Sequence, residues 1–380
     1  MDANKSSRVV LIHDWLTGMR GGEKCLEAMC RRWPEAPLHT LIHKRGSVSA
    51  TIENHPIVTS FLNQLPRVDR YYRYLLPLMP WAVGWKLPDC DLVLSSSHCV
   101  AKGVQAPPGA LHFCYCYTPM RYAWHMQGSY FRDRRWYDLK SALAVRILNR
   151  LREWDRRTAD GVTHFIAISD TVRQRIRECY DRDSVVIYPP VDTRFYAPAD
   201  VPRENYYLIL SAFAPYKRLD LAIDACRKLG RKLVVIGSGQ DEKKLRHLAD
   251  DKIQFLGWQP DDVVRDHLRR CQALLFPGEE DFGIVPVEAQ ACGTPVIAFG
   301  RGGATETVIP WPRPEATGFW FEEQSVDSLA ATLEQFERHR DACDPRHLRA
   351  HALRFRAERY EDELFAYVES VMGGCARAAA

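Results

Sequence analysis

Two glutamates, Glu280 and Glu288, stand eight positions apart around a loop and the start of a predicted helix. The apolar run Ala273-Leu-Leu-Phe276 predicts a buried strand before the loop, and Pro286 and Gly293 are typical of the first turn and the end of a helix. A carboxylate can accept hydrogen bonds from two hydroxyls at once. Glu280 is therefore a candidate for holding the hydroxyls of a sugar, and Glu288 for holding a ribose. Their neighbours Glu279 and Asp281 are expected to face solvent.

The same segment offers hydrogen-bond donors to an anion. Gly283 permits close approach of the backbone, and the free N–H groups of a helix start suit a diphosphate. Lys217 and Arg218 follow another predicted strand at the start of a helix, where the helix dipole disfavours a cation that has no anion to meet. We expect both to neutralise a diphosphate leaving group. The alternative is an exposed basic pair in the first turn of a helix.

These residues lie in motifs that resemble the retaining nucleotide-sugar glycosyltransferases of family 4, which have the GT-B fold. The motifs follow the family's order over about half of the chain. They are Tyr206-Tyr-Leu-Ile-Leu-Ser-Ala-Phe-Ala-Pro-Tyr-Lys217-Arg218, Val234-Val-Ile-Gly237-Ser-Gly239, Phe255-Leu-Gly257-Trp258, Glu280-Asp-Phe-Gly-Ile-Val-Pro-Val-Glu288 and Gly302-Gly-Ala-Thr-Glu306. The resemblance implies an α/β protein with two Rossmann-like domains, each a doubly wound parallel sheet.

The resemblance also implies further donor contacts around the two glutamates and the glycine turns. These candidates are Phe282, Gly283, Ile284, Val285, Gly237, Gly257 and Trp258. Phe282 is expected chiefly to pack against its neighbours. Many family members have an arginine five positions before the lysine, where this chain has Ala212, so Arg218 is the candidate to replace it.

Two shorter motifs, Pro119-Met-Arg-Tyr-Ala-Trp124 and Tyr188-Pro-Pro-Val-Asp192, are similar to those of bacterial mannosyltransferases that build surface polysaccharides. The expected activity is therefore transfer of a hexose, mannose from GDP-mannose, to a lipid-linked glycan with retention of configuration. Two alternatives stay open. A nucleotide-sugar epimerase has the same architecture, and a glycan-binding protein without activity would need less of the site.

The first half holds candidates for the acceptor side. Gly21 and Gly22 follow a predicted strand and resemble a loop whose N–H groups approach the donor phosphates or the acceptor. Asp14, at the end of that strand, is expected either to bind an acceptor hydroxyl or to cap the next loop. Tyr117 stands where relatives often have a histidine, which weakens the case for a single catalytic histidine. A retaining reaction can let the leaving phosphate take the acceptor proton.

We expect no metal cofactor. Asp89-Cys-Asp91 resembles the Asp-x-Asp metal motif of another glycosyltransferase fold, but Asp91 opens a predicted strand and no further oxygen ligands cluster nearby. Gly237-Ser-Gly239 lacks the remaining glycine and the later acidic residue of a dinucleotide-binding fingerprint. We therefore assign it to the donor site of a nucleotide sugar.

Charge is uneven along the chain, whose net charge is +4. Residues 1–200 hold 28 Lys and Arg against 20 Asp and Glu, and nine basic residues fall within 132–157. Segment 71–85 mixes arginines with aromatic and apolar side chains. We expect peripheral binding to the anionic inner face of the cytoplasmic membrane, and no nucleic acid partner. The alternative is a solvated helix face with ordinary core packing.

The elements that must position these residues alternate between strand and helix, which predicts parallel sheets covered by helices. We place an acceptor-binding domain at 1–190, a donor-binding domain at 191–357 and a C-terminal helix, 358–380, that returns to the first domain. The double proline Pro189-Pro190 stiffens the chain at the linker. Twelve cysteines without paired metal spacing and a start without a visible signal peptide indicate a reduced, cytoplasmic location.

Overall fold

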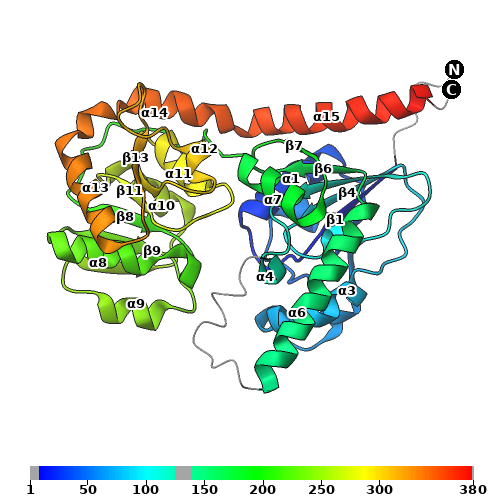
Figure 1. Cartoon of the computed structure of the whole chain (residues 1–380). Helices are drawn as coiled ribbons and strands as arrows, with labels where there is room; N and C mark the ends of the chain where they lie inside the picture. The colour runs from blue at the N-terminus through cyan, green and yellow to red at the C-terminus, as the bar shows by residue number, and fades with distance from the viewer. Residues whose placement is uncertain (1–7, 125–138, 379–380) are drawn as a thin grey trace. The chain divides into compact units, whose positions relative to one another are not determined.

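The computed structural model describes residues 8–124 and 139–378 of the 380-residue chain (Figure 1). The chain forms two compact units. Unit 1 combines Met1–Pro189 with Glu361–Ala380, and unit 2 is the continuous segment Pro190–Tyr360. The first boundary thus falls within the double proline.

Unit 1 is built on a parallel sheet that has, among the described residues, seven strands in the order β3-β2-β1-β4-β5-β6-β7. Its strands are β1 (Val9–His13), β2 (Leu38–Thr40), β3 (Ile57–Thr59), β4 (Leu92–Ser97), β5 (Leu111–Cys116), β6 (His164–Ala167) and β7 (Ser184–Val186). The central strands β1 and β4 are buried along their whole length, as expected for a sheet covered on both faces. Strand order reverses between β1 and β4, which is the switch point of this sheet.

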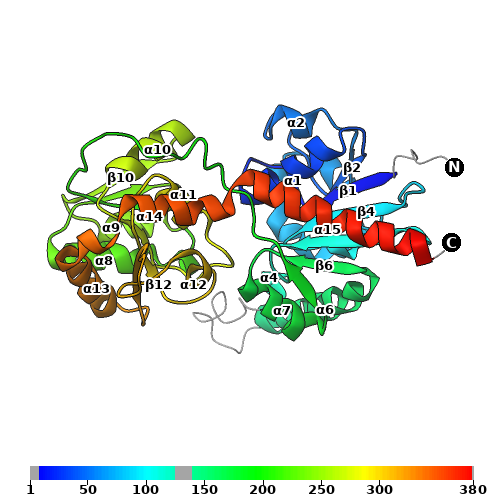
Figure 2. The same cartoon turned by 90° about the horizontal axis from the view of Figure 1, so that it is seen from above.

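Helices cover both faces of the unit 1 sheet. They are α1 (Gly21–Arg32), α2 (Ala50–Glu53), α3 (Met79–Ala82), α4 (Arg121–Trp124), α6 (Leu139–Thr158), α7 (Asp170–Tyr180) and the part of α15 (Ala357–Ala378) that belongs to unit 1. Short 3-10 helices connect them: η1 (Phe61–Gln64), η2 (Val68–Arg70), η3 (Tyr72–Leu78), η4 (Ala101–Gly103) and η5 (Ala159–Gly161). Figure 2 shows α15 lying over the face that α1 also covers, and in Figure 1 α6 lies on the other side.

Ion pairs and rings fasten α15 to the end of α1. Arg31 lies 2.7 Å from Glu361, and Arg32 lies 2.6 Å from Glu369. The rings of Trp33 and Phe365 meet edge to face at 5.3 Å. Residues from the two ends of the chain therefore complete one unit.

Unit 2 has a second parallel sheet, with six strands in the order β10-β9-β8-β11-β12-β13 across the part that the structure describes. The strands are β8 (Tyr207–Leu210), β9 (Leu233–Ile236), β10 (Ile253–Gly257), β11 (Leu274–Phe276), β12 (Val296–Phe299) and β13 (Gly318–Phe321). The helices are α8 (Leu219–Leu229), α9 (Glu242–Leu248), α10 (Asp261–Arg270), α11 (Ile284–Ala291), α12 (Ala304–Thr307), α13 (Val326–Arg338) and α14 (Pro345–Ala352), with η6 (Pro215–Lys217), η7 (Arg340–Ala342) and η8 (Leu353–Phe355). The switch point of this sheet lies between β8 and β11.

The prediction of two doubly wound parallel sheets is confirmed. The helix after the two-glutamate loop starts earlier than predicted, because Gly283 takes a left-handed conformation and caps α11 at Ile284. Glu288 consequently lies in the second turn and not in the first. At α7 the N-cap is Ser169, whose side chain accepts a hydrogen bond from the N–H of Val172.

Candidate functional site

The switch point of unit 2 brings together two of the predicted side chains. Lys217 follows β8 and Glu280 follows β11, and these two strands are neighbours in the sheet. Side chains that follow neighbouring parallel strands meet at the carboxyl edge, where doubly wound sheets bind ligands. Lys217 and Glu280 form an ion pair there, with 14% and 21% of their side chains exposed.

Both side chains of this ion pair are mostly buried, but each keeps some contact with solvent. The Lys217 ammonium also lies 5.2 Å from the centre of the Tyr216 ring. The ammonium can bind a phosphate, and the carboxylate beside it can accept a hydrogen bond from a sugar hydroxyl. The arrangement therefore suits a ligand that carries both groups.

Glycines hold the Glu280 loop in place. The N–H of Gly303 donates to the carbonyl of Glu280 at 2.8 Å. A Cβ on Gly303 would meet the backbone of Phe282 at 2.2 Å, which no side chain tolerates. The Gly302-Gly303 segment after β12 thus packs directly on the loop after β11, and only glycine fits there.

The other predicted glycine turns lie on the neighbouring strands. Gly237 follows β9 with φ +133, and a Cβ there would fall 1.9 Å from the carbonyl oxygen of Ser211 after β8. Its N–H donates to the carbonyl of Gly257 at 2.8 Å. The structure thus joins Gly237 and Gly257. Trp258 projects outward with 75% of its surface exposed.

Arg218 is engaged with a neighbour. Its backbone is left-handed, with φ 52, and it caps α8. Its guanidinium binds both carboxylate oxygens of Asp220, at 3.1 Å each for the two closest contacts. The helix-start position that the sequence predicts is therefore correct. If Arg218 contacts an anion, its guanidinium must be shared between that anion and the Asp220 carboxylate.

Glu288 lies on α11 and is only 5% exposed. Burial raises the pKa of Tyr196, and the nearby charge of Glu288 raises it further. Of the other predicted residues in this segment, Phe282 is buried with its ring 5.5 Å from that of Phe355, which confirms its packing role. Ile284 and Val285 form the first turn of α11 and are half-buried. Asp281 is buried as well, so the expectation that it faces solvent is wrong, whereas Glu279 is exposed.

Two residues that were not predicted from the sequence, Gln290 and His351, hold α11 in place. The amide of Gln290 donates to the carbonyls of Pro286 and Thr307, at 3.0 and 2.7 Å. Its oxygen lies 2.9 Å from Nδ1 of His351, and burial lowers the pKa of His351 to about 4. The neutral histidine donates to Gln290, which fixes the helix that carries Glu288 against α12. No short motif marks such a contact across 61 positions.

At the switch point of unit 1, Asp14 is fully buried at the end of β1. Its two oxygens accept four backbone N–H bonds from residues 98–101, at 2.7 to 3.0 Å. This is the capping arrangement, and it occupies the carboxylate. Nδ1 of His98 lies 3.1 Å from the same side chain. His98 is a candidate that the sequence analysis missed, since a histidine after a serine-rich strand has no distinguishing pattern.

A chain of hydrogen bonds connects the other candidates of unit 1. The Tyr117 hydroxyl donates to the carbonyl of Gly22 and lies 2.8 Å from the hydroxyl of Ser96, which lies 3.0 Å from Nδ1 of His13. Burial raises the pKa of Glu23 in α1, but its attraction to His13, whose Nε2 lies 3.8 Å from the carboxylate, helps to outweigh burial and keeps that pKa below its ordinary value. Tyr117 thus contacts Gly22, which with Gly21 begins the first turn of α1, where the sequence predicts a loop.

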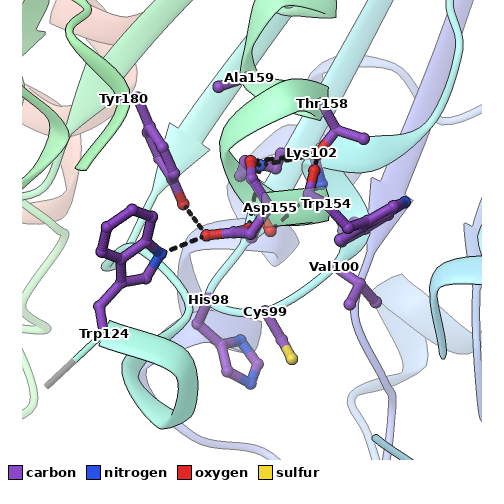
Figure 3. Close-up of polar contacts among 12 residues, drawn as sticks. His98, Cys99, Val100, Lys102, Trp124, Trp154, Asp155, Thr158, Ala159 and Tyr180 are labelled. Atoms are coloured by element: carbon purple, nitrogen blue, oxygen red, sulfur yellow. Dashed lines mark hydrogen bonds and ion pairs between the residues drawn. The ribbon is translucent and has the colours of Figure 1, made fainter. Parts of the chain in front are cut away.

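A buried ion pair stabilises the next segment of unit 1. Nζ of Lys102 lies 3.0 Å from Oδ1 of Asp155 on α6, and both side chains are almost wholly buried. The other carboxylate oxygen accepts hydrogen bonds from Trp124 at 2.8 Å and Tyr180 at 2.7 Å. Figure 3 shows these side chains converging on Asp155 from three directions. The network ties η4, α4, α6 and α7 together.

Apolar side chains are exposed on the short helices between β3 and β4. The most exposed are Tyr74 and Trp81, with 86% and 72% of their surface in solvent. Phe61, Leu65 and Leu78 are partly exposed in the same stretch, whereas Trp85 packs against the core. Of the predicted basic stretch, residues 132–138 lie outside the described residues, and Arg150, Arg156 and Arg157 on α6 are exposed. None of the described helices is both long and apolar enough to cross a membrane.

Comparison with known proteins places this architecture. Residues 195–351 match the family model for glycosyl transferases group 1. An uncharacterised glycosyltransferase of Methanocaldococcus jannaschii is 33% identical over 150 residues, 38% of this chain and 42% of its own. The GDP-mannose-dependent alpha-(1-6)-phosphatidylinositol monomannoside mannosyltransferase of Mycobacterium tuberculosis is 29% identical over 217 residues, 49% of this chain and 55% of its own. The matches span about half the length of these curated relatives.

Solved structures match over nearly the whole chain. Anabaena HepE in complex with UDP aligns with a TM-score of 0.69 at 16% identity, covering 96% of this chain and all of that one. Sucrose-phosphate synthase from Thermosynechococcus elongatus aligns with a TM-score of 0.70 at 15% identity and the same coverage. The fold is therefore GT-B, as the sequence predicts.

Proposed function

We propose that this chain is a retaining glycosyltransferase of family 4 that transfers mannose from GDP-mannose to a lipid-linked glycan. The observation that carries the proposal is the Lys217–Glu280 ion pair at the switch point of unit 2. The pair lies within the segment 195–351 that matches the family model. It combines a phosphate ligand with a hydroxyl ligand, as a nucleotide-sugar donor requires.

In the proposed reaction each residue has a separate role. Lys217 stabilises the charge that develops on the diphosphate as the bond to the sugar breaks. Glu280 holds sugar hydroxyls, and Glu288 holds the ribose from its buried position on α11. The start of α11 places backbone N–H groups near the same edge of the sheet.

The choice of mannose and GDP rests on the curated relatives. Two of them are named as GDP-mannose-dependent mannosyltransferases, whereas HepE was solved with UDP. The identity of the nucleotide base of the donor therefore needs a direct test. We expect GDP to raise the melting temperature more than UDP or ADP at equal concentration, because only a ligand that binds the folded state stabilises it.

The outcomes of this test are distinct. A larger shift with UDP would contradict the assignment of GDP-mannose and leave a glycosyltransferase in place. No shift with any nucleoside diphosphate would contradict the proposed function. Product analysis with labelled GDP-mannose separates the enzyme classes, since an epimerase returns an altered nucleotide sugar and a transferase releases GDP.

We also propose that unit 1 binds the anionic membrane surface that carries the acceptor. Tyr74 and Trp81 supply exposed aromatic side chains, and Arg67, Arg70 and Arg73 lie in the same segment. Interfacial aromatics with flanking basic residues favour this kind of binding. Each basic residue near an anionic surface contributes about 1 kcal/mol, which salt weakens.

Vesicle sedimentation tests this surface. Vesicles with anionic lipids should retain the protein at low salt and release part of it at high salt. Trp81→Ala should complete the release, whereas Trp258→Ala, which removes an equally exposed tryptophan from unit 2, should not. Binding that ignores lipid charge, or equal effects of the two substitutions, would contradict the proposal.

A further inference from the structure

One segment of unit 2 contacts both halves of the motif that runs from Glu280 to Glu288. It consists of the end of α14 and the short helix η8 that follows it. His351 lies in the last turn of α14, and Phe355 ends η8 four positions further along the chain. Side chains four positions apart on a helix lie on one face, and these two rings are in edge contact with their centres 5.6 Å apart. Because α14 packs against α11, this face is turned toward the motif.

Phe355 contacts the loop that carries Glu280. Its ring centre lies 5.5 Å from that of Phe282, and both side chains are 2% exposed. Phe282 stands two positions after Glu280 and directly before Gly283, the left-handed residue that caps α11. The backbone of Phe282 packs on Gly303 and its ring packs on Phe355, so the loop is held from two sides. The loop cannot shift without breaking one of these contacts.

Backbone hydrogen bonds fix the position of Phe355. The N–H of Val191 donates to the carbonyl of Phe355 at 2.9 Å, and Val191 is 1% exposed. The N–H of Arg356 donates to the carbonyl of Leu353 at 3.3 Å, and Val191 and Arg356 form an isolated parallel bridge. The Phe355 ring is therefore a fixed surface against which the loop rests.

His351 contacts the helix that carries Glu288. Nδ1 of His351 lies 2.9 Å from Oε1 of Gln290, which stands two positions after Glu288 on α11. The amide nitrogen of Gln290 donates to the carbonyls of Pro286 and Thr307, so its oxygen is the acceptor that faces the histidine. Burial lowers the pKa of His351 to about 4, so the neutral ring carries its proton on Nδ1. Without this donor the oxygen of Gln290, which is fully buried, would be unsatisfied.

We propose that Phe355 and His351 are positioning residues of the donor site in unit 2. Phe355 holds the loop so that Glu280 reaches the sugar, and His351 holds α11 so that Glu288 reaches the ribose. This inference rests on the proposed function. Each of the two side chains acts on its glutamate through one neighbouring side chain. Because the two contacts lead to different glutamates, their loss should produce two different binding defects.

Equilibrium binding tests the proposal without an acceptor. The probes are GDP and GDP-mannose with the full chain, or UDP and UDP-glucose if UDP gives the larger thermal shift, and calorimetry measures each Kd. Phe355→Leu should weaken binding of the nucleotide sugar by about tenfold and leave the Kd of the free diphosphate unchanged, as expected for lost hydrogen bonds to a charged acceptor. His351→Leu should weaken both ligands by about tenfold, since both contain the ribose. Glu280→Ala and Glu288→Ala give the two reference patterns.

Matched variants separate positioning from general stability. Leu353→Ala changes a side chain between the two residues that is 37% exposed, and it should leave both Kd values unchanged. Phe336→Leu removes a ring from the core of the same unit, beside Phe319, and should lower the melting temperature without changing either Kd. His351→Asn keeps an N–H near the place of Nδ1 and should recover much of the affinity that His351→Leu loses.

A second variant approaches the ring contact from the loop. Phe282→Leu should reproduce the pattern of Phe355→Leu, and the double variant should bind no more weakly than either single one, because both remove the same contact. If Phe355→Leu does not fold, Phe282→Leu decides the same point.

Each result decides a separate point. The inference is overturned if Phe355→Leu loses no more affinity for the nucleotide sugar than Phe336→Leu, or if His351→Asn binds no better than His351→Leu. Unchanged binding of the nucleotide sugar by Glu280→Ala would remove the role of Glu280 and that of Phe355 with it. A wild-type chain that binds no nucleoside diphosphate overturns the proposed function, and this inference with it.

Discussion

Lys217 and Glu280 each neutralise the charge of the other at the edge of the unit 2 sheet. Removing one leaves the other with an uncompensated charge in a sheltered position, so a change at Lys217 alters more than a single phosphate contact. A double-mutant cycle is therefore the appropriate measure of their coupling. The two glutamates, by contrast, can be compared directly, since one lies in the loop and the other is buried in α11.

We predict opposite kinetic effects for these two glutamates. Glu280→Ala should lower kcat more than it weakens nucleotide binding, because sugar hydroxyls are held through the transition state. Glu288→Ala should chiefly weaken nucleotide binding. Steady-state kinetics and calorimetry measure the two effects, with the exposed neighbour Glu279→Ala as the control. Equal and mild losses at both glutamates would contradict the assignment.

The Lys102–Asp155 pair makes a separate prediction about stability. Lys102→Met leaves a buried carboxylate without its cation and should reduce the free energy of unfolding by about 3–5 kcal/mol. Urea denaturation measures this loss. The control is Lys228→Met, which breaks the exposed Lys228–Asp327 contact and should leave the midpoint unchanged. Similar midpoints for both variants would show that burial of Lys102 contributes little.

Single residues show where prediction from the sequence succeeds and where it stops. Lys217 and Glu280 lie in motifs with a fixed spacing, so their positions on strand ends were predictable. The use of Asp14 by four N–H groups and the placement of His98 depend on strands 84 positions apart. No local pattern contains that information. Segment 125–138 lies outside the described residues.

Loops and helix starts in unit 2 depend on glycine at close contacts. The Gly303 backbone touches that of Phe282, and this contact sets the position of the loop that carries Glu280. Strand and helix types follow from apolar periodicity, which explains why most elements were predictable. The three-residue strands β2, β3 and β7 were not predicted, because each mixes polar and apolar residues over too few positions to show a period. The equally short β11 was predicted, because it lies within the apolar run Ala273-Leu-Leu-Phe276.

Gly303→Ala should therefore displace the Glu280 loop. We expect a lower melting temperature together with a weaker nucleotide-induced shift, since backbone atoms 2.2 Å from the new Cβ must move. Gly373→Ala is the control, because a Cβ there meets nothing within 4 Å. That substitution in α15 should be neutral or stabilise by about 0.4–1 kcal/mol. Normal nucleotide binding by Gly303→Ala would show that the loop tolerates displacement.

At the scale of the whole molecule, the cysteines that the structure describes lie inside the fold. Eleven cysteines lie within the described residues, and all eleven are buried and outside any disulfide. Burial raises the pKa of several of them, including Cys25, Cys226 and Cys271, to about 12. Thiolates react and buried thiols do not, so the folded state should protect these side chains.

A thiol reagent tests this at pH 8. At most one of the twelve cysteines should react rapidly in the folded protein, and all twelve should react in denaturant. Bound GDP should slow any remaining reaction in unit 2. Rapid labelling of several thiols in the native state would show that the units open on the timescale of the assay.

Unit 1 contains residues from both ends of the chain, and this has a consequence for synthesis on the ribosome. Arg31, Arg32 and Trp33 are made early, but their partners Glu361, Phe365 and Glu369 emerge only after unit 2 is complete. The outer face of α1 therefore stays exposed to solvent while the 330 residues from Arg31 to Glu361 are translated. Unit 2 is one continuous segment and needs no such delay. The nascent chain can therefore complete unit 2 before unit 1, although most of unit 1 is synthesised first.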